Sequence, residues 1–308
     1  GLYRKGARDI KEMRGIPVRL RDSLSARYRI GSFTVSDLLK SRDGTEKALF
    51  RLNDGRHIET VLIRAAGRKT VCISTQVGCK FACPFCASGQ KGFFRNLTVS
   101  EIVGQITYFR LERGMNLTNY VFMGMGEPLD NFENLSRAIK IMNDPHGLDI
   151  GARRITVSTS GIVPGIERLE GLGLQVNLSI SLHAANDELR NRLVPVNKIY
   201  NIERLVKACG DYFKKTGRIV TLEYVLLKGL NDTPPHADRL AALAKKISAI
   251  VNLIPYSDTH CPEFSYSGEK AAQSFAKKLL ARHVRATIRD SKGKDIEAAC
   301  GQLALKSK

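Results

Sequence analysis

Three cysteines spaced for a metal cluster are the clearest sign of chemistry in this chain. Cys79, Cys83 and Cys86 form a Cys-x3-Cys-x2-Cys pattern directly after a strand-like segment. Three thiolates can hold a [4Fe-4S] cluster while one iron keeps no protein ligand, whereas clusters that only carry electrons usually have four cysteine ligands. The missing fourth ligand indicates an iron that binds another molecule, here S-adenosylmethionine through its amino and carboxylate groups. The pattern therefore predicts a radical enzyme.

Structural zinc is the competing interpretation of the same pattern. A zinc site needs a fourth Cys or His and usually takes it from a second nearby pair. The next candidates, His146, Cys209 and Cys261, are isolated and far along the chain. Ligand number and spacing therefore favour the cluster.

Small and polar residues follow three of the predicted strands. Gly126 and Glu127 belong to a Gly-Met-Gly-Glu-Pro motif, in which glycine lets the backbone approach a ligand and a carboxylate is held at the strand end. Ser158 ends the next strand, and Ser181 and His183 end the following one, where they could hold a carboxylate, ribose or phosphate. Serine is also common in turns, and His183 alone would be a structural histidine. Their place after a three-cysteine loop favours a shared ligand site.

Two further cysteines stand outside the cluster motif. Cys72 lies seven residues before Cys79, and Cys300 lies in a loop-like stretch near the carboxyl end. Spacing alone assigns neither of them a catalytic role, because cysteine is often buried as a small inert side chain.

The remaining pattern predicts the fold. From about residue 72 onward, β-rich runs alternate with helical patterns, which is typical of βα units and a parallel sheet. The predicted strands are 69–75, 119–123, 154–158, 175–182, 219–227 and 250–255. The predicted helices are 99–113, 131–143, 202–214, 236–246 and 269–283. Six units predict an α/β fold, a partial (β/α)6 barrel with its ligand site at the carboxyl ends of the strands.

The first 64 residues are predicted to form a small accessory region. Residues 1 to about 45 are basic and helix-like, and residues 46–64 have the pattern of a hairpin around Asp54-Gly55. We therefore expect an accessory region over 1–64 and a core over 65–308, which includes the carboxyl-terminal extension with Cys300.

Composition indicates that the protein is intracellular and binds nucleic acid. The 308 residues include 49 Lys and Arg against 30 Asp and Glu, a formal charge of +19, which favours a polyanion. Lysines scattered over all faces are the simpler alternative. No apolar run approaches the roughly 20 residues of a membrane helix, and the start lacks the apolar part of a signal peptide. The seven cysteines suit a reducing compartment, so we expect a cytoplasmic protein without a membrane partner.

Taken together, these residues resemble the radical SAM adenine-C2 methyltransferases of ribosomal and transfer RNA, the RlmN family. The resemblance rests on blocks that span nearly the whole chain, namely residues 72–79, 79–88, 122–129, 152–161, 179–184, 193–195, 252–255 and 296–303. It implies a [4Fe-4S] cluster on Cys79, Cys83 and Cys86. It also implies contacts of S-adenosylmethionine with Gly126, Glu127, Ser158, Ser181, Leu182 and His183, and with Ser257, which stands where the family usually has asparagine.

The resemblance also implies the roles of three catalytic residues. C2 of adenine is electron-poor and has no lone pair with which to attack a sulfonium methyl group. In the family, one S-adenosylmethionine methylates Cys300, and a second yields a 5'-deoxyadenosyl radical that takes hydrogen from this methyl group. The carbon radical adds to C2, after which Glu59 accepts the C2 proton and Cys72 releases the base by forming a disulfide with Cys300.

Partners follow from the same resemblance. The resemblance implies 23S rRNA, tRNA or both as substrates, whose target base must leave its stack, and an electron donor such as a flavodoxin system. Residues 288–295 depart from the family's arginine-rich sequence, and Gly1 falls inside its amino-terminal helical region, so we expect part of that RNA-engaging region to be missing. We expect these departures to change substrate preference and to weaken RNA affinity, with the cluster chemistry intact.

Two alternatives remain at this stage. The related C8 methyltransferases (Cfr-type) share the cluster and both catalytic cysteines, although the blocks at 126–128 and 296–303 are more similar to the C2 type. A non-catalytic RNA-binding protein with a structural metal would also explain the charge. It gives no reason for Cys72 and Cys300.

Overall fold

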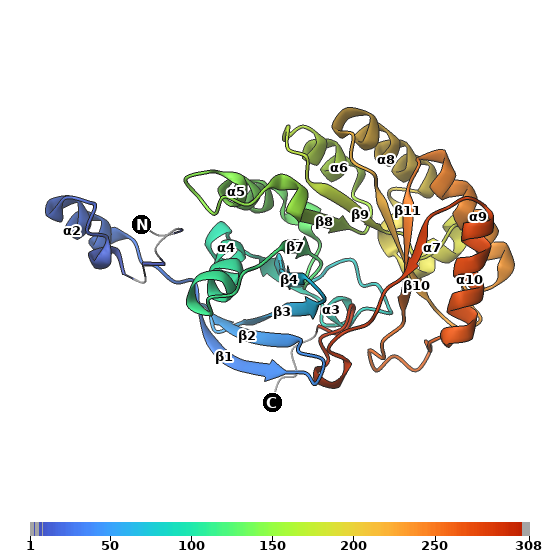
Figure 1. Cartoon of the computed structure of the whole chain (residues 1–308), viewed down its shortest axis with the longest axis horizontal. Coiled ribbons are helices and arrows are strands. Elements are labelled where there is room, and N and C mark those ends of the chain that lie inside the picture. The colour runs from blue at the N-terminus through green and yellow to red at the C-terminus, as the bar shows by residue number, and fades with distance from the viewer. Residues whose placement is uncertain (1–2, 4–5, 8, 304–308) are drawn as a thin grey trace.

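One large sheet organises the chain, and helices cover its outer side (Figure 1). The computed structural model describes residues 3, 6–7 and 9–303. Within these residues, ten strands follow one another in the sheet as β1 (Phe33–Lys40), β2 (Glu46–Leu52), β3 (His57–Ala65), β4 (Arg68–Cys72), β7 (Asn119–Phe122), β8 (Ile155–Thr159), β9 (Asn177–Ser181), β10 (Thr221–Leu226), β11 (Ile250–Pro255) and β12 (Ala286–Ile288). A small second ladder pairs β5 (Gln76–Gly78) with β6 (Phe93–Asn96).

The parallel part of the sheet confirms the predicted α/β barrel. Strands β4 and β7 to β12 run parallel to one another. The six predicted strands correspond to β4, β7, β8, β9, β10 and β11, with ends that differ by at most a few residues. The sequence pattern missed β12, because this edge strand has three residues, two of which are exposed.

The helices lie between the strands in sequence and pack on the outside of the sheet. The structure confirms the five predicted helices as α4 (Val99–Thr107), α5 (Phe132–Asn143), α8 (Ile202–Thr216), α9 (Pro234–Lys246) and α10 (Glu269–Ala281). The remaining α-helices of the described residues are α2 (Val18–Arg27), α3 (Ala87–Gln90), α6 (Val163–Glu170) and α7 (Asp187–Leu193). Thr98 begins α4 with a capping box to Glu101, and the turn Tyr108–Glu112 continues it as a π-helix.

The amino-terminal region differs from its prediction in one element. The predicted hairpin is present as β2 and β3, which pair antiparallel. The expectation of a helix-like stretch to about residue 45 is wrong for Phe33–Lys40, which forms β1 on the edge of the sheet. This strand has a register shift between Val35 and Asp37 and is largely exposed, so its sequence shows no clear alternation.

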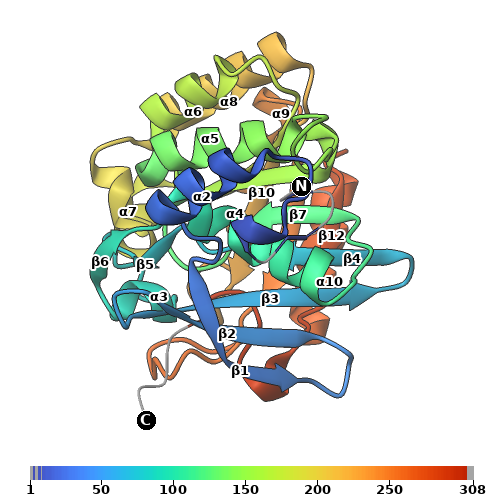
Figure 2. The ribbon, with the colours of Figure 1, turned by 90° about the vertical axis from the view of Figure 1, so that its left-hand side faces the viewer.

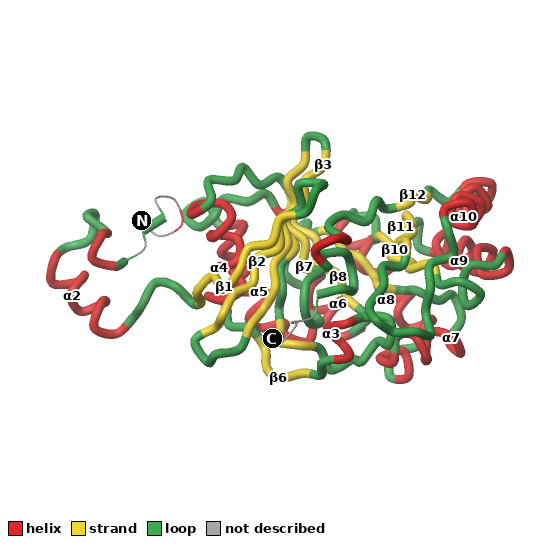
Figure 3. Tube along the Cα trace, turned by 90° about the horizontal axis from the view of Figure 1, so that it is seen from below, coloured by secondary structure: helices red, strands yellow, loops and turns green. Residues whose placement is uncertain are grey.

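The hairpin and the barrel share one sheet. Strand β3 pairs antiparallel with β4, so β1 to β3 extend the parallel sheet across the predicted boundary at residue 64 (Figure 2). Helix α2 has no buried side chain and stands away from the main body (Figures 1 and 3). The division into 1–64 and 65–308 stays a prediction.

A continuous apolar core holds the strands in place. Side chains such as Phe122, Val157, Ile180 and Leu253 are completely buried between the sheet and its helices. None of the helices in the described ranges is both long and apolar enough to cross a membrane.

Candidate active site

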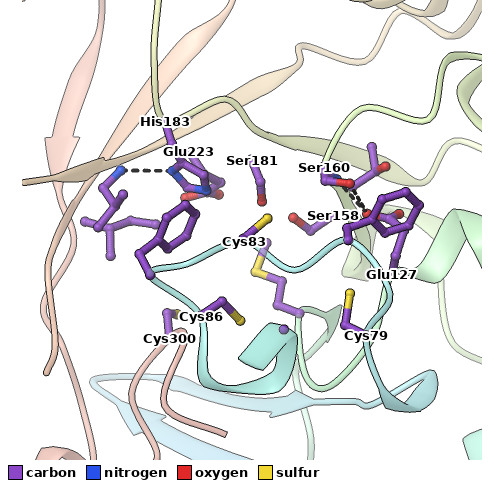
Figure 4. A pocket seen from close by; sticks show the side chains of 18 of the residues that line it. Cys79, Cys83, Cys86, Glu127, Ser158, Ser160, Ser181, His183, Glu223 and Cys300 are labelled. Carbon is purple, nitrogen blue, oxygen red and sulfur yellow. Dashed lines mark hydrogen bonds between the residues drawn. The ribbon is translucent and has the colours of Figure 1, made fainter. Parts of the chain in front are cut away.

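The carboxyl ends of the parallel strands, the cluster loop and the carboxyl-terminal loop enclose one cavity. Figure 4 shows side chains from these three parts around it. The predicted site residues that line the cavity are Cys79, Cys83, Cys86, Gly126, Glu127, Ser158, Ser181, His183, Ser257 and Cys300. The structure therefore brings together ten side chains or backbone positions that the sequence places up to 221 residues apart.

The cysteine loop is held by backbone hydrogen bonds at both ends. The Cys79 N–H donates to the Gly92 carbonyl at 2.9 Å, beside the β5–β6 ladder. The Cys86 N–H donates to the Cys83 carbonyl at 3.0 Å, which closes the turn before α3. The three sulfur atoms face the same space in Figure 4.

These thiols fit an iron–sulfur cluster better than a single ion. No three His, Cys, Asp or Glu side chains of the described residues converge closely enough to hold one metal ion. A cluster does not require such convergence, since each thiolate binds a different iron. Burial raises the pKa of Cys79 to about 12 and raises the pKa of Cys83 well above its usual value. Thiols of this kind remain protonated at neutral pH unless a metal displaces the proton.

The corner after β7 leaves no room for a side chain at Gly126. Its φ is +93°, and an added Cβ would lie 2.4 Å from the Cβ of Gln76. The neighbouring Glu127 accepts hydrogen bonds at Oε2 from the N–H and the hydroxyl of Ser160, at 2.7 and 2.8 Å. Burial raises the pKa of Glu127, and these bonds oppose that effect. The carboxylate is therefore fixed in orientation at the cavity wall.

His183 presents a neutral imidazole to the cavity. Its Nδ1 accepts a hydrogen bond from the Val225 N–H at 3.1 Å, so the ring proton lies on Nε2. Burial lowers the pKa of His183 to about 3. The residue has a φ of +58°, which is strained for a non-glycine residue, and the Phe85 ring packs against it at 4.8 Å. His183 can therefore donate to a ligand without carrying charge.

Three predicted residues do not line the cavity. Leu182 lies in the core, and its N–H donates to the carbonyl of Glu223 at 3.0 Å. Glu59 and Cys72 are buried on β3 and β4. Because Val61 pairs directly with Cys72, and Glu59 is two residues from Val61, both side chains lie on the same face of the sheet.

The loop that carries Cys300 is tied to two other parts of the molecule. The Gly293 N–H donates to Asp43 Oδ2 at 2.8 Å, which fastens the loop to the β1–β2 turn. The Ala87 N–H donates to the Gly301 carbonyl at 2.8 Å, which fastens it to the cluster loop. Cys300 is exposed and lies beside Cys86 at the cavity (Figure 4).

The two catalytic cysteine candidates share one electrostatic environment. The pKa of Cys72 is raised to about 12, because burial and a thiolate at Cys300 raise it more than the positive charge of Arg289 lowers it. Arg289 lines the cavity with Cys300, and Nη1 of Arg289 contacts the sulfur of Met123 at 3.8 Å. All seven cysteines are free thiols, so Cys72 and Cys300 are unbonded here.

The sequence analysis missed two residues at the cavity, Arg289 and Glu223. Glu223 is buried at the cavity wall, and its Oε1 accepts from the hydroxyl of Ser179 at 3.2 Å. Its Oε2 is buried without a hydrogen-bond partner among the described residues. A single acidic residue in the otherwise apolar run Leu222–Leu226 is the signal that could have identified it.

Known proteins share both the sequence and the geometry. A sequence profile of the Radical SAM superfamily matches residues 73–241. The dual-specificity RNA methyltransferase RlmN of Geobacter sulfurreducens is 45% identical over 302 residues, which cover 98% of this chain and 83% of that protein. RlmN of Nitratiruptor sp. is 42% identical, over 99% of this chain and 91% of its own. The crystal structure of a radical SAM methyltransferase from Sphaerobacter thermophilus matches with a TM-score of 0.93 and 46% identity, over 98% of this chain and 90% of that chain.

Proposed function

The chain belongs to the RlmN family of radical SAM RNA methyltransferases, and we propose that it methylates C2 of an adenosine in 23S rRNA and in tRNA. The positive charge of +19 supports a nucleic-acid substrate. Methylation of a purine carbon inside a cavity requires the base to leave its stack. We also propose that the protein acts in the cytoplasm and that a flavodoxin-type protein supplies its electrons.

Three cysteines would bind the cluster, and residues at the strand ends would bind S-adenosylmethionine. Cys79, Cys83 and Cys86 would hold a [4Fe-4S] cluster, which when bound supplies one electron and an iron with a free coordination position to S-adenosylmethionine. The polar groups that would surround this molecule are Gly126, Glu127, Ser158, Ser181, His183 and Ser257. Because His183 is neutral, it orients the ligand by donating a hydrogen bond and adds no charge beside the cluster.

Cys300 would carry the methyl group to the base. Its thiolate displaces the methyl group from one S-adenosylmethionine, forming a sulfur–carbon bond as the sulfonium bond breaks. The methyl group then loses a hydrogen atom to a radical formed from a second S-adenosylmethionine. Its carbon bonds to C2 of adenine and links the RNA to the protein. The exposed position of Cys300 at the cavity suits contact with both a small cofactor and a large RNA.

Release of the product would use the two buried residues behind the cavity. Glu59 accepts the C2 proton, and the sulfur of Cys72 attacks the sulfur of Cys300. The radical adduct gives up its unpaired electron to a redox partner, and the Cys72 thiol loses its proton. A sulfur–sulfur bond then forms while the bond between Cys300 and the methylene carbon breaks, and this carbon takes up a proton to become the methyl group of the product. The shared face of Glu59 and Cys72 supports their joint role in this step.

The observation that carries this proposal is the docking of the Cys300 loop on the cluster loop. The hydrogen bond from Ala87 N–H to Gly301 O places Cys300 in the same cavity as the three thiols. A structural metal site would need no such exposed fourth thiol beside it. The arrangement therefore supports methyl-group transfer over RNA binding alone.

Mass spectrometry of nucleosides tests the proposal. Protein reconstituted without oxygen is incubated with S-adenosylmethionine, a reductant and RNA from cells that lack the modification. We expect 2-methyladenosine from the wild type and from the control Cys261→Ala, and no methylated adenine from Cys300→Ala. A product of 8-methyladenosine would assign the C8 activity instead, and methylation by Cys300→Ala would refute the role of Cys300.

A further inference from the structure

Lys47 is a buried lysine that no step of the proposed reaction uses. It lies on β2 with 6% of its surface exposed. Its Nζ is 2.9 Å from Oε1 of Glu59 and donates to the carbonyl of Glu297 at 3.1 Å. A buried ammonium group is costly to desolvate, and here a carboxylate and a carbonyl compensate for the lost water.

Strand register places Lys47 on the catalytic face of the sheet. Val61 on β3 is directly opposite Lys47 on one side and Cys72 on the other. Residues directly opposite each other point to the same face, and so does Glu59, which is two residues from Val61. Lys47, Glu59 and Cys72 therefore share one face, and the loop with Glu297 packs over it.

The two carboxylate oxygens of Glu59 have different surroundings. Oε1 pairs with Lys47, whereas Oε2 is buried without a hydrogen-bond partner among the described residues. Such an acceptor is normally satisfied, so a free buried oxygen is a position where a substrate group can bind. Oε2 is thus the oxygen of Glu59 that is available to a proton.

Charges around Glu59 oppose one another. Burial raises the pKa of Glu59, the ammonium group of Lys47 lowers it, and the carboxylate of Glu297 on the covering loop raises it. Lys47 is therefore the positive group that opposes the rise in the pKa of Glu59 while this loop is docked.

We propose that Lys47 is a positioning residue that couples docking of the Cys300 loop to the readiness of Glu59 to accept the C2 proton. This inference rests on the proposed function. With the loop docked, Lys47 binds the Glu297 carbonyl and Glu59 Oε1 together. The C2–H bond of the RNA-bound adduct then breaks, its proton goes to Glu59 Oε2, and its electron pair stays with the purine.

The test compares Lys47→Met, which keeps an unbranched side chain but removes the charge, with Lys47→Arg and with Lys40→Met on the exposed strand β1. Three quantities are measured: methylation of Cys300 by peptide mass spectrometry, covalent RNA–protein adduct on denaturing gels, and formation of 2-methyladenosine against pH. For Lys47→Met we expect normal methylation of Cys300 and an adduct that accumulates. Its product formation should rise at a pH about one unit higher than in the wild type, because a neutral partner leaves Glu59 protonated to higher pH.

The variants separate a positioning role from a structural one. Lys47→Arg should restore most of the release rate, and Lys40→Met should match the wild type. Release by Lys47→Met at the wild-type rate with an unchanged pH profile would overturn the proposal. Loss of Cys300 methylation in both Lys47 variants would also overturn it, since Lys47 would then serve the fold of the loop.

A variant without the resolving thiol tests the underlying function separately. Cys72→Ala should accumulate the RNA adduct whatever the role of Lys47. If neither a methylated Cys300 nor an adduct forms in the wild type or in Cys72→Ala, the proposed function fails and Lys47 has no such role.

Discussion

Arg190 is completely buried and joins the ends of two strands at the cavity. Its Nε donates to the carbonyl of Leu182 at 3.1 Å, and its Nη1 donates to Oδ1 of Asn197 at 2.7 Å. Its Nη2 donates to the carbonyls of Ser160 and Ser181, at 2.5 and 3.3 Å. Replacing Arg190 with leucine removes all four bonds. The Leu182 carbonyl keeps a second donor, the Ala184 N–H at 2.7 Å, whereas the Ser160 carbonyl and Asn197 Oδ1 lose the Arg190 donor.

The expected cost follows from these unsatisfied groups. A buried polar group that loses its partner costs about 1 to 3 kcal/mol, and removing the desolvated guanidinium returns part of this. We therefore expect Arg190→Leu to lower the free energy of unfolding by about 3 to 5 kcal/mol. Because Ser160 and Ser181 lie at the cavity, it should also weaken the binding of S-adenosylmethionine.

Chemical denaturation of the protein, followed by circular dichroism, measures this effect. Arg192→Leu is the matched control, because Arg192 lies two residues after Arg190 on α7, is exposed and forms a surface ion pair with Glu263. The control should cost less than about 1 kcal/mol. If the two variants differ by less than the error of the measurement, the assignment of Arg190 as a structural link between the strand ends is refuted.

Three further predictions concern the cavity and its loop. Gly126→Ala should destabilise the protein by about 2 kcal/mol or more and weaken S-adenosylmethionine binding, since φ is +93° and the new Cβ would lie 2.4 Å from a side-chain carbon. The control Gly173→Ala has a φ of +69° and open space around the new Cβ. It should lower the free energy of unfolding by less in chemical denaturation and leave S-adenosylmethionine binding, measured by calorimetry, unchanged. Because burial lowers the pKa of His183 from 6.5 to about 3, the unfolded chain binds its proton first as the pH falls below 6.5. Unfolding free energy should therefore drop by about 2 kcal/mol near pH 5 through this group, and His183→Gln should lessen the drop measured in denaturant series. Asp43→Ala removes the acceptor of the Gly293 N–H, so hydrogen exchange in 290–300 should increase while cluster loading, measured by absorption, stays normal.

The sequence predicted most of the chemistry because the chemical residues occur in short, local patterns. The spacing of Cys79, Cys83 and Cys86 depends on one loop, and Glu127 and His183 follow strands whose apolar runs are easy to identify. The fold confirms that these positions meet at one cavity. Parallel topology explains this result, because it gathers the carboxyl ends of all strands at one edge of the sheet.

The sequence pattern could not predict contacts between residues that lie far apart in the chain. Arg190 resembles an ordinary surface residue of a charged helix, and its burial depends on carbonyls from two other strands. Lys47 lies in an unremarkable hairpin, and its importance depends on strand register and on a loop about 250 residues away. Strand β1 was missed because its edge position leaves most of its side chains exposed.

Transfer of a labelled methyl group through Cys300 tests the central claim most directly. The protein is first methylated with S-adenosylmethionine carrying a carbon-13 methyl group, freed of that cofactor, and then given RNA with unlabelled S-adenosylmethionine for one turnover. The account predicts that the 2-methyladenosine formed first contains carbon-13, because its methyl carbon came from Cys300. Unlabelled 2-methyladenosine in that turnover would show that the methyl group reaches the base without passing through Cys300, and would contradict the account.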